Sequence, residues 1–497
     1  MSQKRFSIFL TTLLVVILSF PIIVLPYQQF IIQETAAQDA SIPYTVATYG
    51  NAWNGTLAFG LNGPTDYLVI MKTDGTLITT RTSSTTYGVV KNIAQDALIF
   101  QGEPQTTAGG NTAPTYVTHI WNVATNTTQD YPNVIGHHDI EYDPINNTFL
   151  TFQSYIRQIG NNAYLFDKII QLDTTGNVLW TWDTYNYIPI SEADPFNLTG
   201  TFQGQEVIDF THCNTLVWDY NNSVIYLNVR HTNTFYEINQ TTSNVIWACG
   251  QFGNFTLLDQ NGSQVPSLWY HSHDLKKVGP YVFTMFNNDF DNITNYNDSS
   301  SQLIEVTLNE QNMTAYVNWS WTAPSQYYST FLGANLMLPN GDWLGDFGSP
   351  THQFVENQPW NFNDTGAVLV EVNPAGQIVR TITFPTGRYI YRVEQLTNLS
   401  PNAFSYIPTT TPTPQPTQIQ SPTTKPSPTR TQTPSPTPSP NPTTTPTATA
   451  TNTPTPTPPP PANSLFIPEI SALIIASIIV VLSSLILLKR KRKKNHP

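Results

Sequence analysis

The sequence predicts an all-β fold, a six-bladed β-propeller, for residues 42–407. This segment is rich in Thr, Tyr, Trp, Val and Ile, which favour strands, and clusters of Asn, Asp, Gly and Pro separate its apolar runs. It contains no helical periodicity of useful length. A strand-turn-strand pattern that often closes on Trp returns along the segment, and such internal repetition is typical of a propeller.

The repeated pattern is clearest at residues 169–180, where two apolar runs flank an Asp-Thr-Thr-Gly turn. Equivalent positions fall near residues 73, 122, 173, 239, 307 and 373. Repeats of this length fit four-stranded blades with connecting loops. A sandwich of two stacked sheets is the competing architecture, and the repetition favours the propeller.

Before the predicted propeller, Lys4 and Arg5 precede an apolar run at residues 6–25. This order is that of a secretory signal. The small residues at 35–37 offer a place for cleavage, and an uncleaved anchor is the alternative. Residues 1–38 are therefore predicted to be a signal peptide or signal anchor.

After the predicted propeller, residues 408–463 are dominated by Thr, Pro and Ser, which indicates a disordered, extended stalk. Residues 464–488 contain an uncharged apolar run long enough to form a transmembrane helix. Residues 489–497 form a basic tail, which the positive-inside rule places in the cytoplasm. We therefore expect a single-pass protein of the cell membrane whose propeller is extracellular.

The predicted exterior part is acidic. The whole chain has 21 Lys and Arg against 33 Asp and Glu, and the basic residues include the run 489–494 in the tail. An acidic exterior excludes a nucleic-acid partner, but an anionic small molecule can still bind where a site is locally positive. Fourteen Asn-x-Ser/Thr sequons between Asn54 and Asn398 also indicate a glycoprotein.

Cys213 and Cys249 are the two cysteines of the chain. They fall on the opening and closing strands of one repeat. Strands three positions apart in a sheet are separated by about 14 Å, which is too far for a disulfide. We therefore expect two unpaired thiols.

Histidines recur at the predicted starts of the innermost strands of successive repeats. The segments are 136–140 (Gly-His-His-Asp-Ile), 211–214 (Thr-His-Cys-Asn) and 269–275 (Trp-Tyr-His-Ser-His-Asp-Leu). The symmetry of a propeller places equivalent positions around one axis. We expect the following side chains to surround one channel: His137, His138, His212, His271 and His273. The remaining histidines do not share this register and are interpreted as structural or, for the last, as part of the tail: His119, His231, His352 and His496.

A predicted hairpin adds further polar groups to this set. His212 and Asn214 are two residues apart on a strand, so they should share one face, and Arg230 ends the returning strand beside them. Arg, His and an amide together suit an oxyanion, and a neutral imidazole can act as a nucleophile. Three histidines could instead bind zinc or copper, but a fixed cation at Arg230 disfavours a metal ion. We predict no metal and no cofactor.

The ordered set of motifs resembles the PAPS-independent aryl sulfotransferases (arylsulfate sulfotransferases), whose fold is a six-bladed propeller. The resemblance covers about residues 45–400. The matching segments are His137–Asp139, His212–Asn214 with Arg230, His273–Asp274, Phe286–Asp289, Leu338–Gly341 and Tyr391–Glu394.

The resemblance implies a ping-pong reaction in which a sulfuryl group moves from a small phenolic sulfate to a phenol through a sulfohistidine, without a nucleotide. The nucleophile falls at His273, with His271 as the fallback. The implied roles of the other residues are as follows: His212, Asn214 and Arg230 hold the sulfuryl oxygens, and His137 and His138 assist, with His138 the better match.

Two positions depart from the family pattern. Asn287 replaces an Asp, and Asp289 stands in place of a Gly, where it could bring a negative charge near an anionic substrate. A non-enzymatic cell-surface binding or adhesion propeller on a stalk is therefore the alternative function. A metal-binding hydrolytic propeller is the third.

Overall fold

The computed structural model describes residues 35–36, 42–83, 86–104, 115–192, 198–290, 299–349 and 366–407. These residues form strands joined by turns and four short 3₁₀ helices, and no helix among them is long and apolar enough to cross a membrane. The predicted stalk, transmembrane helix and basic tail lie outside the described residues, as does the predicted signal except for Thr35–Ala36.

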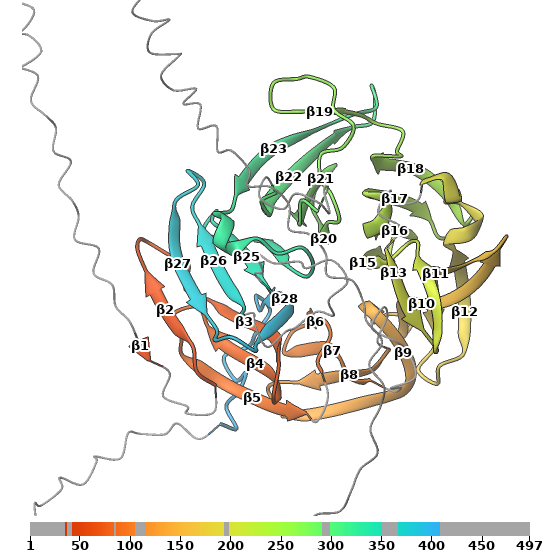
Figure 1. The fold of residues 1–497 in the computed structure, drawn as a ribbon. Coiled ribbons are helices and arrows are strands. Elements are labelled where there is room, and N and C mark those ends of the chain that lie inside the picture. Colours follow the sequence, from red (N-terminus) through yellow and green to blue (C-terminus); the bar gives the residue numbers. More distant parts are fainter. Residues whose placement is uncertain are drawn as a thin grey trace, which may run out of the picture. The chain divides into compact units, whose positions relative to one another are not determined.

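The strands form five sheets arranged around a centre (Figure 1). The first sheet is β28 (Tyr389–Gln395), β3 (Thr56–Asn62), β4 (Asp66–Lys72) and β5 (Leu77–Ser83). The second, of nine strands, comprises β6 (Val90–Ala94), β7 (Ala97–Pro104), β8 (Tyr116–Asn122), β9 (Thr127–Asp143), β10 (Thr148–Ile159), β11 (Asn162–Leu172), β12 (Val178–Asp183), β13 (Thr199–Phe202) and β14 (Gln205–Asp209).

The other three sheets follow in chain order. The third is β15 (Cys213–Asp219), β16 (Val224–Val229), β17 (Thr234–Asn239) and β18 (Asn244–Gly250). The fourth is β20 (His273–Gly279), β21 (Val282–Asn287), β22 (Gln302–Asn309) and β23 (Thr314–Thr322), with β19 (Thr256–Leu258) parallel to β23. The fifth is β24 (Ala334–Met337), β25 (Trp343–Phe347), β26 (Val368–Val372), β27 (Ile378–Thr383), β2 (Thr45–Thr48) and β1 (Thr35–Ala36). The 3₁₀ helices are η1 (Thr184–Asn186), η2 (Ile190–Glu192), η3 (Arg230–Thr232) and η5 (Ser325–Tyr327).

The innermost strands close a ring. Strand β28 contacts β6, β9 contacts β15, β15 contacts β20, and β24 contacts both β20 and β28. Lys91 of β6 completes the circle through ion pairs with Asp139 and Glu141 of β9. The all-β, propeller-like prediction is therefore confirmed.

The number of separate sheets differs from the predicted six blades because β9 is continuous. Its first part, up to Gly136, pairs with β8, and its second part, from His137 onward, pairs with β10. A Cβ atom at Gly136 would lie 1.9 Å from Thr151 Oγ1, so only glycine allows the chain to cross here from one ladder to the next. Two four-stranded ladders thus share one strand and one sheet.

The two ends of the described chain interlock the ring. The late strand β28 is the innermost strand beside β3, with Ile390 opposite Leu61, whereas the early strand β2 extends the last sheet, with Val46 opposite Ile382. The first and last repeats therefore exchange strands. This exchange was not predicted from the sequence, because the repeats were treated as consecutive blades.

Recurring Trp residues link the second, third and fourth sheets each to the sheet that follows. The indole N–H of Trp182 donates to the carbonyl of Ser243, that of Trp247 to the Glu310 carboxylate, and that of Trp321 to the carbonyl of Gly376. Each acceptor lies at a turn of the following sheet. The Trp signal of these repeats is thus an inter-sheet contact, which explains why the pattern often closes on Trp.

Both cysteines are buried and unpaired, as predicted. Cys213 packs in the apolar cluster around Leu216 and Phe166, and Cys249 in the cluster around Trp247 and Phe235. Burial raises the pKa of both thiols well above its usual range, so they remain protonated.

Candidate active site

A cluster of imidazole rings lies where the innermost strands begin. Its members, called the histidine cluster below, are His137, His138, His212, His231, His271 and His273. Ring centroids are 4.9 Å apart for His137 and His138, 4.8 Å for His138 and His212, 4.7 Å for His212 and His231, and 5.3 Å for His231 and His271. Tyr391 of β28 bridges His138 and His273, at 5.9 and 6.4 Å. The predicted convergence of histidines from successive repeats is therefore present.

Three of these histidines have a left-handed backbone. The φ angles are 59° at His138, 47° at His212 and 55° at His271. Residues with a Cβ rarely adopt this region, and each instance costs on the order of 1–3 kcal/mol. Strain repeated at the start of three inner strands is what a functional site would retain.

The left-handed turn at His212 also overturns one prediction. His212 lies before β15 and not in it, so its ring turns toward His138 and His231, whereas Asn214 sits at a bulge in β15. Asn214 is fully buried, its amide N–H₂ donates to the Ser272 carbonyl, and its amide oxygen accepts from Asn228. The two side chains therefore do not share a face.

His273 is buried and has a defined tautomer. The amide N–H₂ of Asn288 donates to the carbonyls of Ser329 and Leu332, so its oxygen faces His273 Nδ1, 2.6 Å away. Nδ1 must therefore carry the proton, and Nε2 has the lone pair. Among the described residues Nε2 of His273 has no hydrogen-bond partner. Burial, followed by the charge of Arg230, holds the pKa of His273 well below its usual range.

Arg230 and His231 form the cationic side of the site. The predicted hairpin brings the backbone N–H of Arg230 to the carbonyl of His212, 3.4 Å away. The Arg230 guanidinium donates to His231 Nε2, and His231 Nδ1 donates to the carbonyl of Asp209. Both ring nitrogens are thus assigned, and burial with neighbouring His212 and Arg230 holds the pKa of His231 well below its usual range. The interpretation of His231 as a structural residue outside the cluster is wrong, because its ring lies between His212 and His271.

His212 is oriented by a carboxylate. Its Nδ1 lies 2.6 Å from Asp209 Oδ2, at the end of β14. Asp209, His212 and His231 bring their ligand atoms within 4.8 Å of one another, a spacing that a metal ion could use. The Arg230 donor already occupies Nε2 of His231, and its charge opposes a cation there. The donor set therefore fits an anion better than a metal.

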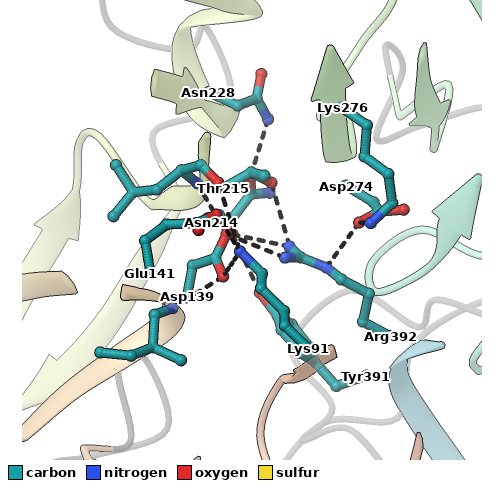
Figure 2. Close-up of polar contacts among 12 residues, drawn as sticks. Lys91, Asp139, Glu141, Asn214, Thr215, Asn228, Asp274, Lys276, Tyr391 and Arg392 are labelled. Atoms are coloured by element: carbon teal, nitrogen blue, oxygen red, sulfur yellow. Dashed lines mark hydrogen bonds and ion pairs between the residues drawn. The ribbon is translucent and has the colours of Figure 1, made fainter. Parts of the chain in front are cut away.

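Beside the histidine cluster, the same inner strands carry buried charges, called the ion-pair network below (Figure 2). Its members are Lys91, Asp139, Glu141, Asp274, Lys276, Arg392 and Glu394. Arg392 lies between two carboxylates, 3.2 Å from Asp139 and 3.3 Å from Asp274, and also donates to the Asn214 carbonyl at 2.9 Å. Lys91 is 2.6 Å from Asp139. Against the effect of burial, Lys91 and Arg392 hold the pKa of Asp139 below its usual range.

The inner strands are also linked by side chains that follow one rule. Asp139 accepts the N–H of Leu216 in the next sheet, Asn214 donates to the carbonyl of Ser272, and Asp274 accepts the N–H of Asn335. Near the start of three inner strands, an Asp or Asn thus bonds to the segment that follows in the next sheet. This explains the acidic and amide residues within the repeated motifs without assigning them to a ligand.

Comparison with known protein families identifies the family of this chain. The model of the family described as Arylsulfotransferase (ASST) matches residues 118–392, more than half of the sequence. The chain belongs to the arylsulfotransferase family. No curated protein matches it.

Solved structures align with this arylsulfotransferase at low similarity. A periplasmic gluconolactonase of Pseudomonas aeruginosa aligns with a TM-score of 0.37 and 9% identity over 69% of this chain and 99% of its own. A nidogen/laminin complex gives 0.38 and 7%, over 69% and 99%. AztD from Citrobacter koseri gives 0.35 and 8%, over 69% and 98%.

The two departures from the family pattern have structural partners in this arylsulfotransferase. Asn287 accepts the backbone N–H groups of Tyr270 and Asp289 and donates to Gln302. Asp289 accepts the N–H of Ser300 in a left-handed turn with φ 53°. Both side chains therefore stabilise the segment that presents Asn288 to His273.

Several site residues were missed by reasoning from the sequence. They are Asp209, His231, Asn288 and, as a charged group of the ion-pair network, Lys91. His231 could have been found because it adjoins Arg230 in the same turn, and Asn288 because it lies within a segment that matches the family pattern. Lys91 carries no local signal. His119 lies apart, stacked on Phe100 and 2.7 Å from Asp130, and His352 and His496 lie outside the described residues.

Proposed function

We propose that this arylsulfotransferase moves a sulfuryl group from a phenolic sulfate ester to a phenol by a ping-pong mechanism, with His273 as the nucleophile. The observation that carries the proposal is the Asn288–His273 pair, which leaves a neutral imidazole with its Nε2 lone pair uncommitted beside Arg230. A neutral imidazole attacks sulfur, and the fixed cation stabilises the sulfuryl oxygens.

The remaining site residues have supporting roles in this proposal. Arg230 and His212 lie close enough to hold the sulfuryl oxygens, and His138 acts on the phenolic oxygen. His137 supports His138, and His271 flanks the cation through its ring contact with His231. Asn214 is assigned here to holding β15 against the next sheet, because its amide donates to Ser272. No metal or cofactor takes part.

We propose the following organisation for the whole chain. The two ladders that share β9 act as two of six blades, and the ring is an extracellular domain on residues 42–407. A stalk at 408–463, a single transmembrane helix at 464–488 and a cytoplasmic tail at 489–497 anchor it to the cell membrane. Protease treatment of intact cells should then release the folded domain into the medium.

The test uses the purified full-length chain, p-nitrophenyl sulfate as donor and phenol as acceptor, without nucleotide. We expect release of p-nitrophenol that depends on the acceptor, and a sulfated His273 when the enzyme is trapped with donor alone and digested for mass spectrometry. No turnover across a panel of aryl sulfates, together with binding to glycans or cells, would instead support the adhesion function.

A further inference from the structure

A buried carboxylate lies behind the first histidine pair. Asp167 of β11 is 3.2 Å from His137 Nε2, and the hydroxyl of Ser154 donates to the same carboxylate oxygen at 2.7 Å. The Ser154 oxygen is also 2.9 Å from His137 Nε2. Because a hydroxyl has one proton and Ser154 gives it to Asp167, His137 Nε2 must be the donor in this contact.

The other nitrogen of His137 faces its neighbour. His137 Nδ1 and His138 Nδ1 are 2.7 Å apart, so one proton lies between them. If His137 holds that proton, it is an imidazolium and His138 carries its own proton on Nε2. If His138 holds it, His137 is neutral and His138 has a lone pair on Nε2. The pair therefore has two states that differ by one proton. Nε2 of His138 is an acid in the first state and a base in the second.

Asp167 stays ionised in both states. Its second oxygen accepts the backbone N–H of Cys213 at 2.7 Å and the Thr211 hydroxyl at 2.8 Å. Burial alone would raise its pKa, but the contacts with His137, Ser154 and Cys213 outweigh burial and hold the pKa well below its usual range. A permanent negative charge thus stands beside Nε2 of His137, the ring nitrogen that does not face His138.

The surroundings of His138 oppose a charge on that ring. His212, His273 and the Tyr391–Arg392 pair of β28 face it from three other segments. Burial with His212, His137 and His273 holds the pKa of His138 well below its usual range. A proton stored by the pair therefore belongs on His137, next to Asp167. The His138 residue is partly buried, and its Nε2 has no hydrogen-bond partner among the described residues.

We propose that Asp167, His137 and His138 form a proton relay, in which His138 is the catalytic acid and base and Asp167 and His137 are positioning residues that store the proton. This inference rests on the proposed sulfuryl transfer. In the first half-reaction, the His273 Nε2 lone pair forms the N–S bond as the S–O bond of the donor breaks. The leaving phenolic oxygen takes the proton of His138 Nε2, and His138 Nδ1 takes the proton of His137 Nδ1. Attack by the acceptor phenol on sulfur reverses each proton movement, so the relay returns to its starting state.

The first test compares donors whose phenols differ in acidity. A p-nitrophenolate leaves without protonation, whereas the phenolate of phenyl sulfate needs a proton. Asp167→Asn and His137→Gln in the full-length chain should lower kcat/KM for phenyl sulfate about 100-fold, the usual scale of acid catalysis, and for p-nitrophenyl sulfate far less. Equal losses with both donors would overturn the relay, because a merely structural defect affects every donor alike.

His137→Gln covers the case in which Asp167→Asn fails to fold, since glutamine keeps a donor toward Ser154 but cannot pass a proton. Asp143→Asn is the matched control: this buried carboxylate lies on the same strand β9 and accepts backbone N–H groups of Ile145 and Asn146. It should leave the ratio of the two donors unchanged.

A second readout needs no turnover, so it separates failure of the relay from failure of the proposed function. Deuterium exchange at the imidazole C2 position, followed by mass spectrometry of the peptide with residues 137 and 138, reports the titration of the pair. Asp167→Asn should shift its midpoint to lower pH, and Asp143→Asn should not. An unchanged midpoint in folded Asp167→Asn protein would overturn the relay, whatever the wild type catalyses.

Discussion

The histidine cluster and the ion-pair network lie side by side at the inner strands but differ in charge. The network pairs charged side chains, and the cluster contains neutral imidazole rings. In the network, Arg392 contacts Asp139 and Asp274, and Lys91 contacts the same Asp139 and also Glu141, so both cations are compensated. In the cluster, burial keeps His138, His231 and His273 neutral. Charges with partners hold strands together, whereas the neutral ring of His273, whose Nε2 has no hydrogen-bond partner among the described residues, keeps a reactive lone pair.

Two inner strands, β20 and β28, each carry residues that contact or belong to the histidine cluster and residues of the ion-pair network. On β20, His273 stands at the start, and Asp274 and Lys276 follow. On β28, Tyr391 contacts the histidines, and Arg392 and Glu394 join the network. A substitution in the cluster should therefore change chemistry with little effect on stability, and a substitution in the network should do the reverse.

The largest expected effect is the loss of the nucleophile. His273→Asn should reduce sulfuryl transfer by on the order of 10⁴-fold or more, because no covalent intermediate can form. The thermal midpoint should change little. His119→Gln is the matched control, since His119 stacks on Phe100 apart from the cluster. Residual turnover above a hundredth of the wild-type rate in His273→Asn would remove His273 from this role.

A substitution in the ion-pair network should lower the free energy of unfolding. Arg392→Met leaves Asp139 and Asp274 without a guanidinium between them, and breaking a buried pair in this way costs about 3–5 kcal/mol of the free energy of unfolding. Denaturant unfolding of the full-length chain measures the loss. Adding Asp139→Asn should recover part of it, because the two remaining cations, Lys91 and Lys276, then have one carboxylate fewer to compensate. A loss below about 1 kcal/mol would contradict the cohesive role of this network.

A substitution at Asn288 tests whether this side chain keeps the lone pair of His273 on Nε2. Asn288→Ala removes the acceptor that holds the proton on His273 Nδ1, and we expect kcat to fall about 100-fold while KM changes little. Asn318→Ala, on an exposed part of β23, is the control. If the loss appears in KM alone, Asn288 contributes to binding and not to the orientation of the nucleophile.

The smallest effect is a pH dependence of stability. The folded chain holds the pKa of His138, His231 and His273 below that of free histidine. Below about pH 6.5 the unfolded chain therefore binds more protons, so the free energy of unfolding falls as the pH falls. Unfolding midpoints at pH 7.5 and 5.5 measure the difference, and His231→Asn should reduce it. An equal difference in the variant would show that His231 does not contribute to the pH dependence.

The sequence alone determined the all-β class, the repetition and the register of the histidines. These follow from local rules: strand propensity, turn residues and a Trp that often ends the repeated pattern. The segments 136–140, 211–214 and 269–275 were predicted to converge because equivalent positions of repeats surround one axis, and their rings do meet. The two thiols were likewise expected to be unpaired.

Only the tertiary structure decided what each ring can do. The tautomer of His273 depends on Asn288, which is itself oriented by the carbonyls of Ser329 and Leu332. Arg392 reaches Asp139 from a strand 253 residues later, and β9 runs through two ladders where six separate blades were expected. Hydrogen-bond partners from distant strands leave no periodic trace in the chain, because each depends on one contact across the ring and not on a repeated local pattern.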